Sequence, residues 1–136
     1  MRYVAIGHVC QDLLPAGWMF GGAATYSSRL ARALGCDVQV ITSLHPAVDV
    51  TPALADIDVL RYPSLHTTTF ENVYTSTGRR QILHAVAERL SPDRFPAART
   101  ADVVHLAPIA QEVDLGWLDH FPGALMGVTP QGWLRP

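Results

Sequence analysis

The sequence GGAATYSSRLARALG begins with two adjacent glycines, Gly21 and Gly22, and ends at Gly35. Backbone without side chains before a helix lets a ligand approach closely, so the pair could hold a phosphate or another substrate group. The same glycines could instead only permit a tight turn from loop to helix. Neither common phosphate loop is present: no G-x-x-x-x-G-K-S/T motif occurs, and Gly7 and Gly21 are fourteen positions apart, too far for a dinucleotide fingerprint.

Asp12 is the candidate polar contact, because it follows the first strand-like run in the stretch GHVCQD. A carboxylate at the carboxyl end of a strand can accept two hydrogen bonds from neighbouring hydroxyls of a polyol. An ordinary solvated loop aspartate is the alternative. Aromatic rings could cover the apolar face of a sugar ring, or could simply pack in the core. The aromatic candidates are Trp18, Phe20, Tyr26, Phe70 and Tyr74.

Metal and nucleophile chemistry is not indicated by the spacing of the ligating residues. His8 and Cys10 would share one strand face, but two ligands do not make a zinc site, and the other histidines are scattered. No G-x-S-x-G elbow of a hydrolase occurs. We therefore expect no metal bound by protein side chains.

Composition limits the class of protein. The chain has 136 residues, of which 49% are hydrophobic and 16% charged, which suits one domain with a core and argues against disorder. The formal net charge of −2 gives no basic field for nucleic acid or an anionic membrane. No apolar run approaches the roughly 20 residues of a bilayer span, and no signal-peptide pattern opens the chain. With two cysteines and no C-x-x-C pair, a cytoplasmic location is expected.

The elements that would position these residues follow a parallel α/β pattern. Strand-like apolar runs occur at 2–9 and 36–44, and between them Tyr26, Leu30 and Leu34 have helical spacing. Strand, helix, strand is typical of a parallel sheet. Two more buried strands are expected at 101–108 and 123–130, separated by a short amphipathic helix that carries Leu115, Leu118 and Phe121.

The middle of the chain has a different pattern. Strand-like runs at 58–63, 67–75 and 79–86 have no helix between them, and a glycine-containing turn joins the last two into an antiparallel hairpin. We predict an antiparallel lid-like insert at about residues 59–87. The last strand leaves the sheet unfinished, so we expect an open apolar edge with Leu125, Met126 and Val128, and a sequence that is the first part of something longer.

Four stretches together resemble the ribokinase-like, or PfkB, carbohydrate kinases. GHVCQD is similar to the family's first strand and its aspartate, and GGAATYSSRLARALG is similar to its N-terminal signature. The hairpin TTTFENVYT and GRRQILHAV stands where the family has a substrate lid, and ADVVHLAPIA with GVTPQGWLR is similar to its next two core strands. GGAATYSS, TTTF and QGWLR most resemble a branch that includes inositol-kinase-like proteins.

This resemblance covers the N-terminal half of the family and implies an incomplete ribokinase-like core with a small β lid. It implies the substrate-binding part of an ATP-dependent sugar or polyol kinase, with Gly21 and Gly22 as the substrate floor and Asp12, Tyr26 and Phe70 as further contacts. Tyr26 stands where many members have an asparagine that contacts sugar hydroxyls. The family's G-A-G-D-like catalytic motif is absent, so no catalytic residue is expected in this chain. ATP and Mg²⁺ would belong to the full-length parent, and the isolated chain should be inactive.

Two other interpretations stay open from the sequence. One is a non-catalytic small-molecule binding or interaction module of the same fold. The other is an unrelated small α/β domain of the nucleotide-binding type. For the kinase interpretation the expected partner is a small-molecule sugar or polyol rather than nucleic acid or membrane, and self-association would be a homodimer through the lid or the open sheet edge.

Overall fold

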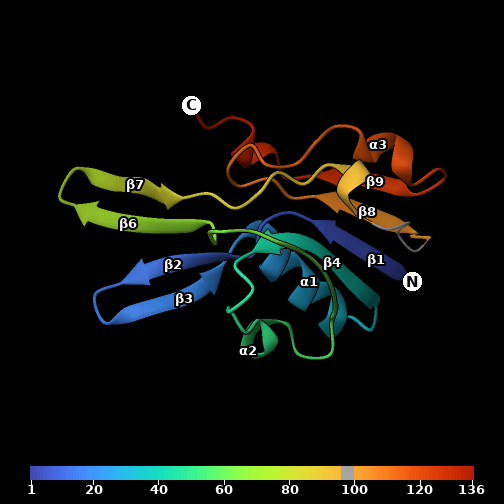
Figure 1. Ribbon diagram of the computed structural model, residues 1–136, viewed down its shortest axis with the longest axis horizontal. Coiled ribbons are helices and arrows are strands. Elements are labelled where there is room, and N and C mark those ends of the chain that lie inside the picture. Colours follow the sequence, from blue (N-terminus) through green and yellow to red (C-terminus); the bar gives the residue numbers. More distant parts are fainter. Residues whose placement is uncertain (96–99) are drawn as a thin grey trace.

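The computed structural model describes residues 1–95 and 100–136, which form two sheets (Figure 1). In chain order the elements are β1 (Arg2–Ile6), β2 (Cys10–Leu14), β3 (Gly17–Gly21), α1 (Ala23–Ala33), β4 (Asp37–Leu44), α2 (Thr51–Leu54), β5 (Asp58–Pro63), β6 (Thr69–Thr75), β7 (Gly78–Ala85), β8 (Val103–Leu106), α3 (Trp117–His120) and β9 (Leu125–Val128). Short 3₁₀ turns lie at Pro92–Arg94 and Pro130–Gly132.

The body is a five-stranded parallel sheet in the order β5-β4-β1-β8-β9, which confirms the predicted α/β class. Its central strands are buried on both faces. One face packs against α1 and α2 around Ala5, Val40 and Ala107, and the other packs against α3 and the segment before it around Ile6 and Leu106. None of the helices in the described ranges is long and apolar enough to cross a bilayer.

Helix α1 lies where the sequence predicts it, but a different face is buried. Tyr26, Leu30 and Leu34 are exposed, and the small residues Ala24, Thr25, Ser28 and Ala31 face the sheet. Small side chains let the helix lie close to the strands, so burial follows size rather than hydrophobicity here. Gly35 ends the helix with a φ of 86°, a left-handed conformation that suits glycine.

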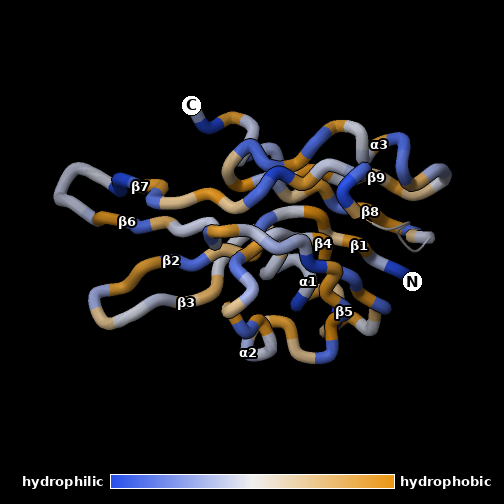
Figure 2. The backbone as a smooth tube through the Cα atoms, in the orientation of Figure 1, coloured by the Kyte–Doolittle hydropathy of each residue, from blue (hydrophilic) through white to orange (hydrophobic). Residues whose placement is uncertain are grey.

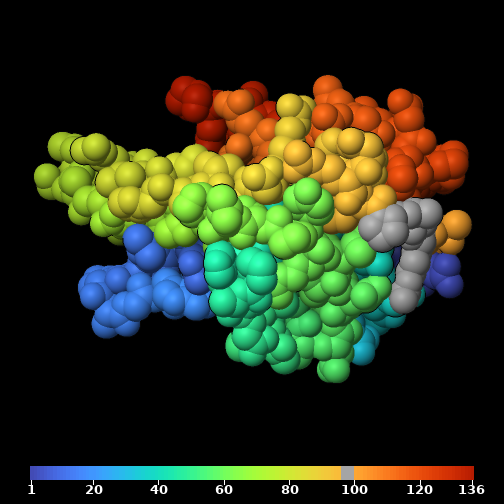
Figure 3. All heavy atoms as spheres, in the orientation of Figure 1, coloured from blue at the N-terminus to red at the C-terminus, as the bar shows by residue number. Residues whose placement is uncertain are grey.

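The second sheet is mixed, with the order β3-β2-β6-β7. The hairpins β2–β3 and β6–β7 are each antiparallel, and β2 pairs with β6 in parallel. Both hairpins extend from the same side of the body (Figures 1 and 3). The predicted antiparallel hairpin around residues 70–86 is therefore confirmed, as part of a mixed sheet separate from the body. Its role as a lid stays a prediction.

Two parts of the sequence-based assignment are wrong. Residues 58–63 do not belong to the insert: β5 pairs in parallel with β4 in the body, because the segment 45–57 with α2 supplies the crossover that a parallel strand needs. The stretch that leads to the glycine pair, for which the sequence predicts no strand, forms the hairpin β2–β3. Gly17, with a φ of 128°, makes its tight turn possible.

The C-terminal part of the body also differs in detail. Helix α3 has a single turn. Trp117 within it and Phe121 directly after it are buried, whereas Leu115 before it and Leu118 within it are exposed. Strand β9 is the edge of the sheet as predicted, with Leu125 and Val128 exposed and Met126 partly buried against the core. Self-association through this edge or through the second sheet stays a prediction.

Candidate functional site

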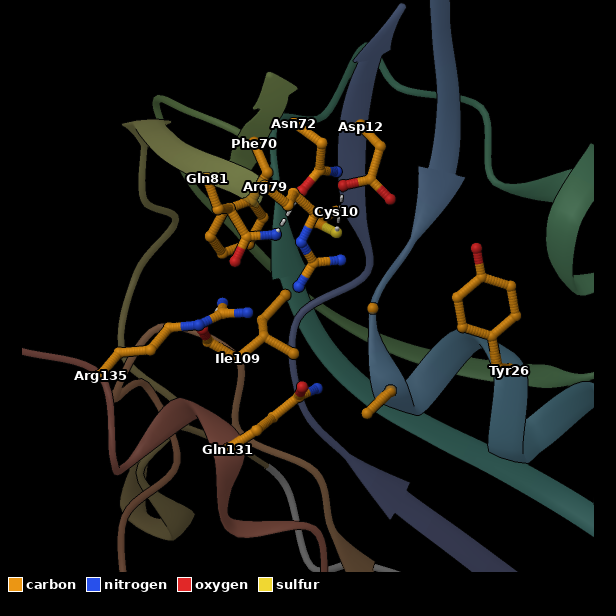
Figure 4. Close-up of a pocket in the computed structure, with 12 residues that line it drawn as sticks. Cys10, Asp12, Tyr26, Phe70, Asn72, Arg79, Gln81, Ile109, Gln131 and Arg135 are labelled. Carbon is orange, nitrogen blue, oxygen red and sulfur yellow. Dashed lines mark hydrogen bonds between the residues drawn. The ribbon is translucent and has the colours of Figure 1, made fainter. Parts of the chain in front are cut away.

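A cavity of about 210 Å³ opens between the mixed sheet, the start of α1 and the segments after β8 and β9 (Figure 4). It is lined mainly by polar and charged groups. The lining residues are Cys10, Asp12, Gly22, Ala23, Tyr26, Phe70, Asn72, Arg79, Gln81, Ile109, Gln131 and Arg135.

Strand register places one wall of this cavity. Asp12 on β2 lies beside Phe70 on β6, and Asn72, two residues further along β6, lies opposite Gln81 on β7. Since alternate residues of a strand share a face, these side chains point to the same side of the sheet. Gln81 Nε2 donates a hydrogen bond of 3.0 Å to Asn72 Oδ1, which holds the two amides together. The wall thus presents a carboxylate and two amides to one space.

At Gly21 the Asp12 carboxylate occupies the space that a side chain would need. A Cβ added at Gly21 would lie 2.0 Å from Asp12 Oδ2 and 3.2 Å from Cys10 Sγ. Asp12 is half-buried, and this burial raises the pKa of its carboxyl, opposed by the Cys10 thiol and the positive Arg135. The carboxylate is therefore partly stripped of water, and it has capacity to accept hydrogen bonds from a ligand.

Gly22 lets the start of α1 lie against the backbone of the β1–β2 connection. Its φ is 98°, and a Cβ there would lie 2.5 Å from the backbone oxygen of His8. The Gly22 carbonyl accepts the first backbone hydrogen bonds of α1, from Thr25 and Tyr26. The glycine pair therefore brings the helix start against the β1–β2 connection, and it leaves room for the Asp12 carboxylate.

The opposite wall comes from the C-terminal segment. A Cβ at Gly132 would lie within 2.4 Å of the Pro108 and Ile109 backbone, so only glycine allows this segment to pass so closely. The approach carries Gln131 and Arg135 to the cavity. Arg135 Nη1 donates to the Ile109 carbonyl, and the guanidinium lies over the Phe70 ring, with its central carbon 4.7 Å from the ring centroid.

A buried polar cluster beneath the cavity fixes both walls. The Glu112 carboxylate accepts hydrogen bonds from the backbone N–H groups of His8, Ile109 and Ala110. Because the Glu88 carbonyl can only accept, His8 carries its proton on Nε2 and donates it there at 2.9 Å. Its Nδ1 then accepts from the Thr68 hydroxyl at 2.7 Å. The cluster ties the body to the mixed sheet at the point where the cavity forms.

Asp12, Gly22, Tyr26 and Phe70 of the predicted site line this one cavity, and Gly21 borders it through Asp12. Asp12 lies within β2 rather than at the end of the first strand, and Tyr26 lies at the rim with about half of its surface exposed. A role of these residues in binding stays a prediction. Trp18 and Phe20 do not line the cavity; their rings stack edge to face, 4.8 Å apart.

Sequence reasoning missed most of the polar lining. Asn72 was accessible from the pattern, because it is two residues from Phe70, and Gln81 follows if the hairpin register is known. Arg79 can be assigned to the cavity only if the same hairpin register is known. Nothing in the sequence pattern points to Gln131 or Arg135, which reach the cavity only through the close approach at Gly132. In the part of the chain that the structure describes, no group of three or more His, Cys, Asp or Glu side chains comes together as a metal site.

No family model matches the sequence, and no curated protein matches it. Solved structures match the fold. A sulfate complex of a pyrophosphate-dependent kinase in the ribokinase family superposes with a TM-score of 0.80 at 20% identity, over 98% of this chain and 51% of that one. Such a kinase complexed with a pyrophosphate analogue and myo-inositol gives 0.77 at 21% identity, over 98% and 50%. Fructokinase with bound ATP from Xylella fastidiosa gives 0.60 at 18% identity, over 77% and 38%.

The chain thus spans about half the length, or less, of the solved kinases that it matches. At these identities the likeness concerns the fold. The five-stranded parallel sheet and the four-stranded mixed sheet are together the fold of one half of a ribokinase-family kinase.

Proposed function

We propose that this chain is the substrate-binding part of a ribokinase-family, PfkB-type kinase that transfers a phosphoryl group to a hydroxyl of a sugar or polyol. The observation that carries the proposal is the Asp12 carboxylate, held beside Gly21 on the wall of a polar cavity. The matching kinase complexed with myo-inositol supports a polyol as the substrate class.

In this proposal the residues of the chain bind and orient the substrate. Asp12 accepts hydrogen bonds from two neighbouring hydroxyls, the Asn72 and Gln81 amides contact others, and Phe70 lies behind them as an apolar surface. Phosphoryl transfer depends mainly on positioning and charge stabilisation, so holding the accepting hydroxyl in place is a substantial part of the chemistry.

The phosphoryl donor belongs to the intact kinase in this proposal. Both donor types occur among the matching structures, since one fructokinase binds ATP and other kinases depend on pyrophosphate. ATP with Mg²⁺, the donor that the sequence resemblance implies, is therefore one of two donor hypotheses. A mixture of the chain with a polyol and either donor is expected to give no turnover, and measuring product with each donor tests this.

Calorimetric titration of the chain with myo-inositol and with fructose tests the binding role. Asp12→Asn should weaken binding by about 10- to 150-fold, because a charge-assisted hydrogen bond is worth roughly 1.5–3 kcal/mol. Glu71→Gln is the matched control, since Glu71 neighbours Phe70 on β6 but pairs with His84 instead of lining the cavity. Equal affinity of the Asp12 variant and the parent chain would contradict the proposal.

A further inference from the structure

The charges of the cavity are unequal. Asp12 is its one acidic lining residue, whereas Arg79 and Arg135 both line it. Figure 4 shows the two guanidinium groups pointing into the same space, Arg79 from β7 and Arg135 from the opposite wall. Within residues 1–95 and 100–136 the ion pairs involve other residues, so neither guanidinium is paired with a carboxylate.

The two arginines differ in how they are held. Arg135 is fixed by its hydrogen bond to the Ile109 carbonyl and by its stacking on Phe70. Arg79 lies opposite Tyr74 near the tip of the β6–β7 hairpin, and among the described residues it makes no side-chain hydrogen bond. One cation is thus placed in advance, and the second is free to meet a ligand from the lid side.

A guanidinium presents a planar pair of donors that matches a carboxylate or a phosphate, and such charge-assisted pairs are about twice as strong as neutral hydrogen bonds. A neutral polyol would use Asp12 and the amides but would bring no anion to Arg79, and none to Arg135 beyond the Asp12 charge that it already faces. Resting on the proposed function, we infer that the substrate is an anionic polyol. Its hydroxyls meet Asp12, Asn72 and Gln81, and its carboxylate or phosphate group lies between Arg79 and Arg135.

The neighbouring residue Arg80 provides a matched control. It is next to Arg79 on β7 and pairs with Val73, so it points to the other face of the sheet and does not line the cavity. Arg79→Gln and Arg80→Gln remove the same charge from adjacent positions. Any difference in binding between the two variants is therefore caused by the loss of Arg79 from the cavity, because the net charge of the chain changes equally in both.

Calorimetry on the chain would use four probes: myo-inositol, a myo-inositol monophosphate, glucuronate and inorganic phosphate. One of the two anionic polyols should bind at least tenfold more tightly than myo-inositol, and which one does so identifies the anionic group as phosphate or carboxylate. Arg79→Gln should weaken binding of the preferred anionic polyol at least tenfold, while Arg80→Gln should change it less than twofold. Raising the salt concentration should reduce the preference for the anionic ligand.

Three results would overturn the inference: equal binding of neutral and anionic polyols, equal loss in the two arginine variants, or inorganic phosphate that binds as tightly as the polyol phosphate. Asp12→Asn separates this failure from failure of the proposed function. If myo-inositol binds in an Asp12-dependent manner without any anionic preference, only the inference fails. If no polyol binds, the proposed function fails with it.

Discussion

The two sheets of this chain differ in where they place their large apolar side chains. In the body, Ile6, Ile41, Leu106 and Trp117 are fully buried between the sheet and its covering segments. In the mixed sheet, large apolar residues such as Leu14, Trp18 and Met19 keep about half of their surface exposed. Figure 2 shows the hydrophobic colour continuing from the body onto the β2–β3 hairpin.

The body and the mixed sheet therefore contribute differently to the molecule: one to stability, the other to the cavity. Burial of apolar surface stabilises the body, which holds the start of α1 and the Ile109 backbone in place. The mixed sheet has few buried residues of its own, but its cavity face carries Asp12, Asn72, Arg79 and Gln81. Regions with few buried contacts open at low cost, so we expect the hairpins to move independently of the body on binding.

The largest effect expected from this comparison concerns two tryptophans. Trp117 is fully buried and donates its indole N–H to the Leu90 carbonyl at 2.9 Å, whereas 45% of Trp18 is exposed. Trp117→Ala should lower the free energy of unfolding by about 3–5 kcal/mol, and Trp18→Ala by less than about 1 kcal/mol. Urea unfolding of both variants measures this. Similar losses would show that the hairpins carry as much of the stability as the body.

The next largest loss of stability is expected from substituting a glycine with a positive φ. Gly22 lies against His8, where the body meets the mixed sheet, and Gly35 lies away from this junction. Gly22→Ala meets the His8 carbonyl, while a Cβ at Gly35 meets nothing within 4 Å. In both variants the positive φ should lower the free energy of unfolding by about 1–3 kcal/mol, and the overlap in Gly22→Ala should lower it by about 1–3 kcal/mol more. Thermal unfolding compares them. Equal shifts in melting temperature would mean that the backbone around Gly22 and His8 moves at little cost and is not a rigid part of the site.

The sequence predicted the body better than the mixed sheet, for physical reasons. The central strands at 2–6, 37–44 and 103–106 are apolar runs, because both faces of a central parallel strand are buried. Strand β5 has the same local pattern as the hairpin strands, and only its partner β4 decides which sheet it joins. In the site, Asp12 and Phe70 follow from local pattern, whereas Arg135 depends on backbone packing at Gly132.

A smaller effect should come from acidification, through His8 at the junction. Burial lowers the pKa of its imidazole below the usual 6.5, despite the nearby Glu112 carboxylate. Below that usual value the unfolded chain binds a proton that the folded chain does not. The free energy of unfolding should therefore fall as pH decreases, by about 1.4 kcal/mol per pH unit until the lowered pKa is reached.

Urea midpoints at pH 7.5 and 5.5 measure this loss. His8→Gln should reduce it relative to the parent chain. Burial also lowers the pKa of His105, so the difference between the parent chain and His8→Gln isolates the contribution of His8. If the parent chain and His8→Gln lose the same free energy of unfolding on acidification, protonation of His8 does not destabilise the contact between the body and the mixed sheet.

The smallest effect on stability should come from Asp12→Asn, although its effect on binding should be large. Because burial raises the pKa of Asp12, the folded chain disfavours the ionised carboxylate, and the free energy of unfolding falls as pH rises through that pKa. The amide removes this cost, so the variant should be slightly more stable at pH 7, by less than about 1 kcal/mol because solvent screens a half-exposed group. At pH 3, where the carboxyl is mostly protonated, the two chains should be closely similar in stability. Urea unfolding at both pH values checks the sign. A variant less stable than the parent at pH 7 would mean that the carboxylate stabilises the mixed sheet, and Asp12 would then be part of its structure rather than a group kept ready for a ligand.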